Sequence, residues 1–259
     1  MSQFEFKGAV AVVTGGAGGI GRALSERLAE EGCRVAVVDL DAGRAEQAAS
    51  GIDGAVGLAA DVGDRLSVAS MVRAVESALG PIDIYCSNAG IAVGRGLGED
   101  DEWEASWRVH GMAHVHAARE VLDGMTQRGK GAFVVTASAA GLLMMMQSGP
   151  YTVTKHASVA VAEWLAVTYG GSGVQFHCLC PQGVNTPMVQ SDTSGQTELT
   201  ASGNIIEPEQ VAVDVVAAIR DNRFLVLPHP EVHDYEKMKV EDRDRWLAGM
   251  RRLLAKVRG

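Results

Sequence analysis

The stretch AVAVVTGGAGGIG, residues 9–21, decides the fold of this chain. Its first part, Ala9–Thr14, is a short apolar and β-branched run, which is typical of a buried strand. Glycines follow, and a helical pattern over Ile20–Glu31 begins at once. Glycines keep such a turn tight and let backbone N–H groups approach a pyrophosphate, which the helix N-terminus also attracts. The stretch therefore predicts a strand–turn–helix unit that binds a dinucleotide.

The same alternation continues along the chain. Further strands are expected at Val35–Asp39, Ala55–Ala59, Ile82–Ser87, Ala132–Thr136, Val174–Leu179 and Phe224–Leu227. Helical patterns separate them at Arg65–Leu79, with Asp64 as a plausible N-cap, and at His114–Arg128, Tyr151–Tyr169 and Pro208–Arg220. Near-continuous apolar strands that alternate with helices predict an α/β fold: a single Rossmann-type, doubly wound parallel sheet with helices on both faces, formed by residues 1–259 as one domain.

Two segments depart from the alternation. Residues 188–207 are rich in Ser, Thr and Gly and are expected to form either a substrate flap or an inert surface loop. Residues 241–257 form a helical pattern whose apolar stripe we expect to pack on the body of the protein or on a neighbouring subunit. The stripe consists of Trp246, Met250, Leu253, Leu254 and Val257.

Composition excludes several classes of protein. With 47% hydrophobic and 21% charged residues, the 259-residue chain is neither disordered nor fibrous. A net charge of −9 disfavours binding to nucleic acid or to an anionic membrane surface. The start of the chain lacks the pattern of a signal peptide, and its four cysteines form no CxxC pair, so we expect a cytoplasmic protein with reduced thiols. His110 and His114 have metal-ligand spacing, but no third ligand accompanies them, and no metal is expected.

Asp39 points to the cofactor. It closes the second expected strand, eighteen residues past Gly21. An acid at this place can accept hydrogen bonds from the adenosine ribose hydroxyls, and it would repel a 2′-phosphate. The sequence therefore predicts NAD rather than NADP.

Tyr151 and Lys155 lie four residues apart, one turn along an expected helix. A free phenol has a pKa of about 10, and a nearby cation would lower it toward neutrality. This pair predicts a tyrosine that gives and takes a proton. The YxxxK pattern also arises by chance, and the case for chemistry rests on its combination with the glycine turn and Asp39.

Together these motifs resemble the short-chain dehydrogenase/reductase family over essentially the whole length. Residues 14–21 resemble its TGxxxGxG turn, Ser87-Asn88-Ala89-Gly90 its NNAG signature with Ser87 in place of the first Asn, and Pro181–Thr186 the stretch that closes over the nicotinamide. The resemblance implies a cofactor site made of Gly15, Gly19, Ile20, Gly21, Asp39, Asp61, Val62, Asn88, Ala89, Gly90, Tyr151, Lys155, Pro181, Val184 and Thr186.

The resemblance also implies an activity: hydride transfer between NAD(H) and a secondary alcohol or ketone. Tyr151 would exchange the alcohol proton, Lys155 would lower its pKa and hold the nicotinamide ribose, and Ser138 would hydrogen-bond the reacting oxygen. A small-molecule alcohol or carbonyl compound is then the substrate, and a homotetramer or homodimer is the expected assembly.

One position departs from the family. Its fourth catalytic residue is an Asn in the helix after the fourth strand, where this chain has His110, and no Asn occurs between Asn88 and Asn185. A neutral imidazole could position a water behind Lys155, so that activity would fall below about pH 6.5. The alternative is that His110 only packs between its helix and the sheet.

Two other functions stay open on the sequence alone. One is a carbonyl reductase that acts on 3-oxoacyl groups of an acyl-carrier protein, against which Asp39 counts. The other is a dinucleotide-binding regulator without turnover, against which intact Ser138, Tyr151 and Lys155 count. Residues 142–146, LLMMM, are expected to line an apolar substrate pocket together with Met188, with core packing as the alternative.

Overall fold

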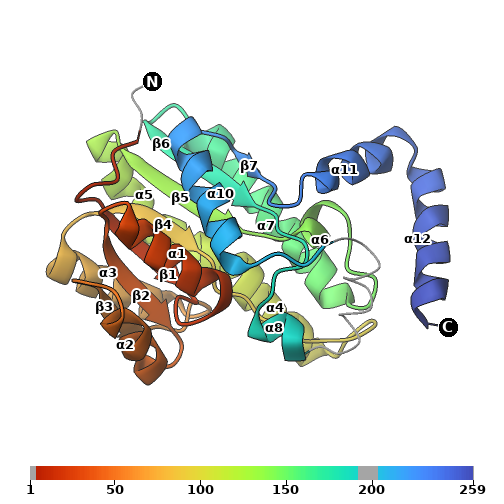
Figure 1. Ribbon diagram of the computed structural model, residues 1–259, viewed down its shortest axis with the longest axis horizontal. Coiled ribbons are helices and arrows are strands. Elements are labelled where there is room, and N and C mark those ends of the chain that lie inside the picture. Colours follow the sequence, from red (N-terminus) through yellow and green to blue (C-terminus); the bar gives the residue numbers. More distant parts are fainter. Residues whose placement is uncertain (1–3, 192–203, 259) are drawn as a thin grey trace.

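The computed structural model describes residues 4–191 and 204–258. Its centre is one sheet of seven strands, in the order β3-β2-β1-β4-β5-β6-β7, with all neighbours parallel (Figure 1). The strands are β1 (Val10–Thr14), β2 (Arg34–Asp39), β3 (Val56–Ala59), β4 (Ile82–Ser87), β5 (Gly131–Thr136), β6 (Val174–Leu179) and β7 (Leu225–Val226). All seven expected strands are present, with ends that differ by at most one residue.

Helices cover both faces of the sheet, and a hydrophobic core lies under each layer. The helices α1 (Gly19–Glu30) and α10 (Pro208–Asp221) pack on one face. The helices α3 (Arg65–Leu79), α5 (Ala113–Arg128) and α7 (Gly149–Tyr169) pack on the other. The short α2 (Ala42–Ser50) lies beside β3 at the edge of the sheet. The doubly wound α/β prediction is confirmed.

The strand order reverses at β1. This strand pairs with β2 on one side and with β4 on the other. The connections that follow β1 and β4 therefore run to opposite sides of the sheet. Such a reversal opens a crevice at the carboxyl edge of a parallel sheet, which is where ligands bind in this architecture. The glycine turn follows β1 directly, and therefore lies at this crevice.

Caps explain two helix starts. The Asp64 side chain accepts a hydrogen bond from the backbone N–H of Ser67 at 2.7 Å, which confirms the N-cap expected for α3. Helix α7 begins at Gly149, two residues before the expected start, because Ser148 caps it by accepting from the Tyr151 N–H at 3.2 Å and Pro150 fits its first turn.

The segment before α5 is more helical than the sequence pattern indicated. Helix α4 (Asp100–Trp107) starts with a capping box between Glu99 and Glu102, and a π-helical turn, η1 (Arg108–Met112), joins it to α5. The turn contains His110, and π-turns of this kind are frequent at functional sites. Within it, His110 and Gly111 are buried.

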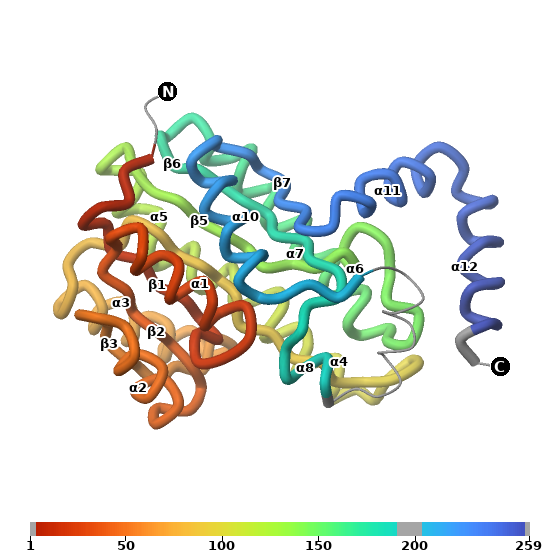
Figure 2. The backbone as a smooth tube through the Cα atoms, viewed as in Figure 1, coloured from red at the N-terminus to blue at the C-terminus, as the bar shows by residue number. Residues whose placement is uncertain are grey.

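The C-terminal helix expected over 241–257 is present as α12 (Arg243–Arg258). A further helix that sequence reasoning missed, α11 (Glu231–Glu241), precedes it, and Asp242 between the two is extended. Figure 2 shows α12 standing apart from the sheet, and every described side chain of α12 keeps some exposure to solvent. Three residues of the expected stripe, Trp246, Met250 and Leu253, border a cavity in the single chain. Packing of the stripe on a neighbouring subunit stays a prediction.

The expected flap is described only in part. Residues 187–191 form the short helix α8 (Pro187–Ser191), and residues 192–203 lie outside the described part of the chain. Within residues 4–191 and 204–258, no helix is long and apolar enough to cross a membrane.

Candidate active site

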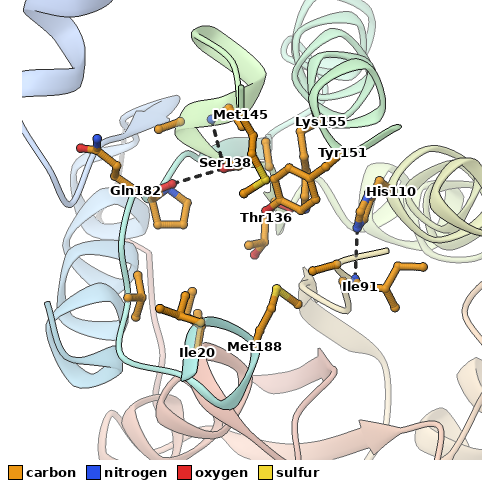
Figure 3. A pocket seen from close by; sticks show the side chains of 18 of the residues that line it. Ile20, Ile91, His110, Thr136, Ser138, Met145, Tyr151, Lys155, Gln182 and Met188 are labelled. Atoms are coloured by element: carbon orange, nitrogen blue, oxygen red, sulfur yellow. Dashed lines mark hydrogen bonds between the residues drawn. The ribbon is translucent and has the colours of Figure 1, made fainter. Parts of the chain in front are cut away.

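A cavity of about 960 Å³ opens at the carboxyl edge of the sheet. Figure 3 shows its inner part, with Tyr151, Lys155 and Ser138 on one side and Ile20 on the other. The lining includes every site residue expected from the sequence: Gly15, Gly19, Ile20, Gly21, Asp39, Asp61, Val62, Asn88, Ala89, Gly90, His110, Ser138, Tyr151, Lys155, Pro181, Val184 and Thr186. The fold thus brings to one place residues that are spread over 172 positions, from Gly15 to Thr186 counted inclusively.

The glycine turn after β1 requires glycine at two positions for different reasons. Gly19 has a φ of +50°, a left-handed conformation that other residues adopt only with strain. A Cβ at Gly21 would lie 2.1 Å from the carbonyl oxygen of Gly15, which no side chain tolerates. The turn therefore delivers the N-terminus of α1 into the cavity with open backbone around it, the geometry that accommodates a pyrophosphate.

Asp39 lies at the end of β2, in the same cavity. Its Oδ2 accepts a hydrogen bond from the Ala17 N–H at 3.2 Å, which fixes the carboxylate against the glycine turn. Arg44, which sequence reasoning missed, also lines this end, and its guanidinium lies 3.3 Å from where a Cβ on Gly18 would be. No sequence motif marks Arg44, because only the packing of α2 against the turn brings it there.

Asn88 ties three strand ends together. Its Nδ2 donates to the Thr14 carbonyl at 3.0 Å, and its Oδ1 accepts from the Thr136 hydroxyl at 3.0 Å. The Thr14 hydroxyl in turn accepts from the backbone N–H groups of Asn88 and Ala89, at 2.9 and 3.1 Å. These bonds join the ends of β1, β4 and β5, so the floor of the cavity is rigid.

Tyr151 and Lys155 project from one face of α7 toward Ser138. The Lys155 side chain is only 3% exposed, and its Nζ donates to the Thr136 carbonyl at 3.0 Å and lies 5.7 Å from the centre of the Tyr151 ring. The Ser138 hydroxyl caps the four-residue helix α6 (Ala139–Leu142) by accepting from the Ala140 N–H at 3.1 Å. The three side chains face the same space (Figure 3), which is the geometry required for proton exchange with one substrate oxygen.

Burial controls the titration of this cluster. It raises the pKa of Tyr151, against a smaller lowering by the hydrogen bond with Ser138. Burial also lowers the pKa of Lys155 to about 8. Sequence reasoning expected Lys155 to lower the pKa of Tyr151. In the protein without cofactor, the loss of solvation on burial shifts this pKa in the opposite direction.

His110 is fully buried, and protein groups occupy both of its ring nitrogens. Its Nε2 accepts from the Ile91 N–H at 3.1 Å (Figure 3), and its Nδ1 lies 2.9 Å from the Thr154 hydroxyl. Because Nε2 accepts, the proton of the neutral ring is on Nδ1. The water relay through this ring, which the sequence suggested, does not fit, since no nitrogen is left for a water.

The charge state of His110 also differs from the expectation. Burial, followed by the nearby charge of Lys155, lowers the pKa of His110 well below its usual value. His110 therefore stays neutral at pH 6.5, and loss of activity at that pH would have another origin. What the ring does is join the chain after β4 to α7, the helix that carries Tyr151 and Lys155.

His114, one turn further on, makes a second buried contact. Its Nδ1 lies 2.7 Å from the hydroxyl of Ser87, the residue that departs from the family's NNAG signature. Burial, with a smaller effect of Lys155, lowers the pKa of His114 to about 3, so this ring is neutral as well. The Ser87–His114 pair thus adds a polar link between β4 and α5 beneath the cavity.

Comparisons with known proteins agree with this geometry. The family model described as short chain dehydrogenase matches residues 9–197. A 1-deoxy-11-beta-hydroxypentalenate dehydrogenase of Streptomyces avermitilis is 35% identical over 232 residues, 85% of this chain and 84% of that protein. A D-threitol dehydrogenase of Mycolicibacterium smegmatis is 32% identical over 236 residues, 86% of this chain and 90% of that protein.

Solved structures give the same result. A short chain dehydrogenase/reductase from Burkholderia phymatum, in complex with NAD, superposes with a TM-score of 0.85 at 27% identity. The match covers 93% of this chain and 96% of that chain. Sequence and structure therefore lead to one family.

Proposed function

This chain belongs to the short chain dehydrogenase family, and we propose that it is an NAD-dependent oxidoreductase of secondary alcohols and ketones in which Tyr151 is the acid and base. One observation carries the proposal: Tyr151, Lys155 and Ser138 line the same cavity as the glycine turn and Asp39. A substrate oxygen at Tyr151 and a dinucleotide on the turn would then meet in one cavity.

In the proposed reaction, the Ser138 hydroxyl hydrogen-bonds the substrate oxygen and fixes its position. The Tyr151 phenolate takes the alcohol proton during oxidation, and the phenol returns it during reduction. A nicotinamide held at the glycine turn and Lys155 would supply the hydride chemistry. Lys155 places a positive charge beside the phenol and would donate to the nicotinamide ribose, so it would serve both turnover and binding.

A turnover assay tests this proposal. Purified protein with NAD and a panel of secondary alcohols should form NADH, and with NADH and the matching ketones should consume it. The regulator alternative requires that NADH binds with no turnover of any alcohol in the panel. The acyl-carrier alternative requires turnover of 3-oxoacyl substrates only.

The predicted preference for NAD over NADP is tested by substituting Asp39. NADH should bind roughly tenfold or more tightly than NADPH, because the Asp39 carboxylate would face the 2′-phosphate. Asp39→Ala should remove most of this difference, since it leaves the nearby Arg44 cation to attract the phosphate. Titration of intrinsic fluorescence with each cofactor measures both dissociation constants.

Asp53→Ala, in the exposed turn before β3, is the control and should leave the ratio unchanged. Arg44→Ala should bind NADPH more weakly than the wild type does, because the cation that attracts the 2′-phosphate is lost. Equal affinities in the wild type, or a ratio that Asp39→Ala leaves intact, would show that Asp39 does not select the cofactor.

His110 gives a second prediction. His110→Ala should lower kcat by about tenfold with NADH affinity unchanged, because the Ile91 N–H and Thr154 lose their common partner. His110→Asn should retain most activity, since an amide oxygen can accept from the Ile91 N–H. Stopped-flow or steady-state rates at pH 8 compare the three proteins.

The pH profile separates positioning from titration. Because His110 stays neutral, the wild type and His110→Asn should show the same dependence of kcat on pH between about 6 and 8. A step near pH 6.5 that only the wild type shows would contradict this role. So would wild-type turnover by His110→Ala.

Two features support proposals on environment and assembly. All four cysteines are buried free thiols, which supports the reducing environment of a cytoplasm. Three large side chains on one face of α7, namely Val153, Trp164 and Val167, are exposed. Such a face supports burial against a second copy of the chain in a homodimer or homotetramer.

A further inference from the structure

The part of the cavity beyond Tyr151 is apolar. The loop after α6 lines it with Leu143, Met144, Met145 and Met146, and α8 adds Met188. Figure 3 shows Met145 and Met188 on two sides of the space in front of Tyr151. The Met-lined pocket expected from the sequence is therefore present, and flexible thioether side chains can adapt to an irregular apolar ligand.

The C-terminal arm, defined as α11 and α12 (residues 231–258), forms the opposite wall. Met238 of α11 lines the cavity, and α12 adds Trp246, Met250 and Leu253 at steps of four and three residues. These steps place the three side chains on one face of α12. The apolar face of α12 is thus turned toward the same space that Tyr151 faces.

A buried lysine fixes the arm in this position. Lys239 near the end of α11 is only 8% exposed, and its Nζ donates to the carbonyl oxygens of Leu142 and Leu143. The same ammonium lies 5.3 Å from the centre of the Trp246 ring, a cation–π contact. One side chain thus contacts both Trp246 of the arm and the end of α6, directly before the methionines.

From this arrangement we infer the substrate class: a bulky, apolar secondary alcohol or ketone, of two or more fused rings or a comparable hydrocarbon. The inference rests on the proposed function. The reacting carbon lies at Tyr151 and Ser138, and the hydrocarbon body lies between the methionines and α12. Trp246, Met250 and Leu253 are only half-buried, so such a body would remove further apolar surface from water.

A polyol does not suit this wall. Each hydroxyl that enters an apolar site without a partner loses its hydrogen bonds to water. On the arm, the described charged groups that line the cavity are Glu241, Asp242, Arg245 and Arg252, all on its exposed rim. The other lining residues of the arm offer mainly carbon and sulfur, with the Tyr235 hydroxyl and the Trp246 indole N–H as their side-chain polar groups.

Three ring alcohols that share one reacting group test this inference. NADH formation is measured with cyclohexanol, with 2-decalol, which adds a second hydrocarbon ring, and with myo-inositol, which adds hydroxyls. We expect kcat/KM for 2-decalol to exceed that for cyclohexanol by roughly tenfold to hundredfold, since four carbons are added to the buried body. We expect myo-inositol to fall at least about tenfold below cyclohexanol.

Adjacent leucines on α12 give a matched pair of variants. Leu253 lines the cavity and Leu254 does not, and both are half-buried. Leu253→Ala should raise KM for 2-decalol about tenfold and KM for cyclohexanol much less, and Trp246→Ala should raise KM for 2-decalol more than Leu253→Ala does. Leu254→Ala should change neither substrate. Sedimentation of all variants shows whether the arm instead binds a second copy.

The outcomes separate this inference from the proposed function. Turnover of cyclohexanol or myo-inositol without a preference for 2-decalol overturns the substrate class and leaves the oxidoreductase intact. Equal effects of Leu253→Ala and Leu254→Ala would mean that both leucines act only through the stability of α12. A loss of self-association with unchanged selectivity would mean that α12 forms a subunit interface. Either outcome also overturns the substrate class. Absence of NADH with every alcohol, including 2-decalol, overturns both.

Discussion

Tyr151→Phe should lower kcat by about 10²–10⁴-fold while leaving NADH affinity nearly unchanged. The substitution removes one hydroxyl, and the ring keeps its place beside Lys155 and its edge-to-face contact with His110, 5.4 Å between ring centres. The substrate proton then has no acceptor at the reacting oxygen. Steady-state rates with a turned-over alcohol, together with an NADH titration, measure the two effects separately.

The control lies on the same helix. Tyr169 at the end of α7 packs against Phe176 and Trp164, away from the cavity, and Tyr169→Phe should keep full turnover. Circular dichroism of both variants should match the wild type. A Tyr151→Phe protein that kept more than about a tenth of the wild-type rate would rule out Tyr151 as the acid and base.

The parts of the site that the sequence predicted are those tied to strand ends. Asp39 ends β2, Ser87-Asn88 ends β4 and Ser138 follows β5 closely, so a correct list of strands already placed these residues at one edge of the sheet. The glycine turn was predictable for the same reason. Its conformation depends on the backbone of residues that are close in sequence.

The parts that sequence reasoning missed depend on tertiary packing. The contact of Lys239 with Leu142 joins residues 97 positions apart, and no periodic pattern reveals it. Because the sequence does not reveal that contact, the apolar stripe of α12 was interpreted as an ordinary packing face. Arg44 was missed for a similar reason, because its place in the cavity follows from the position of α2.

The pKa values of Tyr151 and His110 were the properties of the site that the sequence predicted least well. A phenol and an ammonium one turn apart suggested a lowered phenol pKa, but burial of Tyr151 raises it. Burial likewise lowers the pKa of His110 well below its usual value, and the Ile91 N–H donates to its Nε2. Desolvation depends on all surrounding groups, and a local motif contains no information on how deeply a group is buried.

Lys155→Met should lower kcat by roughly 10²-fold or more and weaken NADH binding, because the charge beneath Tyr151 and the donor to the ribose are both lost. The same substitution should stabilise the protein without cofactor. Lys155 is buried and its Nζ donates to the Thr136 carbonyl, and burial lowers its pKa from 10.5 to about 8. Met has a similar shape and no charge to desolvate.

The gain in stability should depend on pH in a defined direction. Because the pKa is lower in the folded than in the unfolded protein, wild-type stability rises as the pH increases from about 8 toward 10.5, where the unfolded chain still holds the proton and the folded one has released it. Below pH 8 the wild type carries the full penalty. The advantage of Lys155→Met should therefore be largest at pH 7 and should shrink by about 2 kcal/mol by pH 9.5.

Urea unfolding of both proteins at the two pH values measures this change, with Lys7→Met, at an exposed lysine, as a control that should show none. An advantage of Lys155→Met that is constant with pH would mean that Lys155 is already neutral, or not desolvated, in the folded protein. A variant less stable than the wild type at pH 7 would mean that the bond to the Thr136 carbonyl outweighs the burial of the charge. The predicted combination, a more stable protein that has lost turnover, would show that the lysine is kept at this buried position for the reaction and not for the fold.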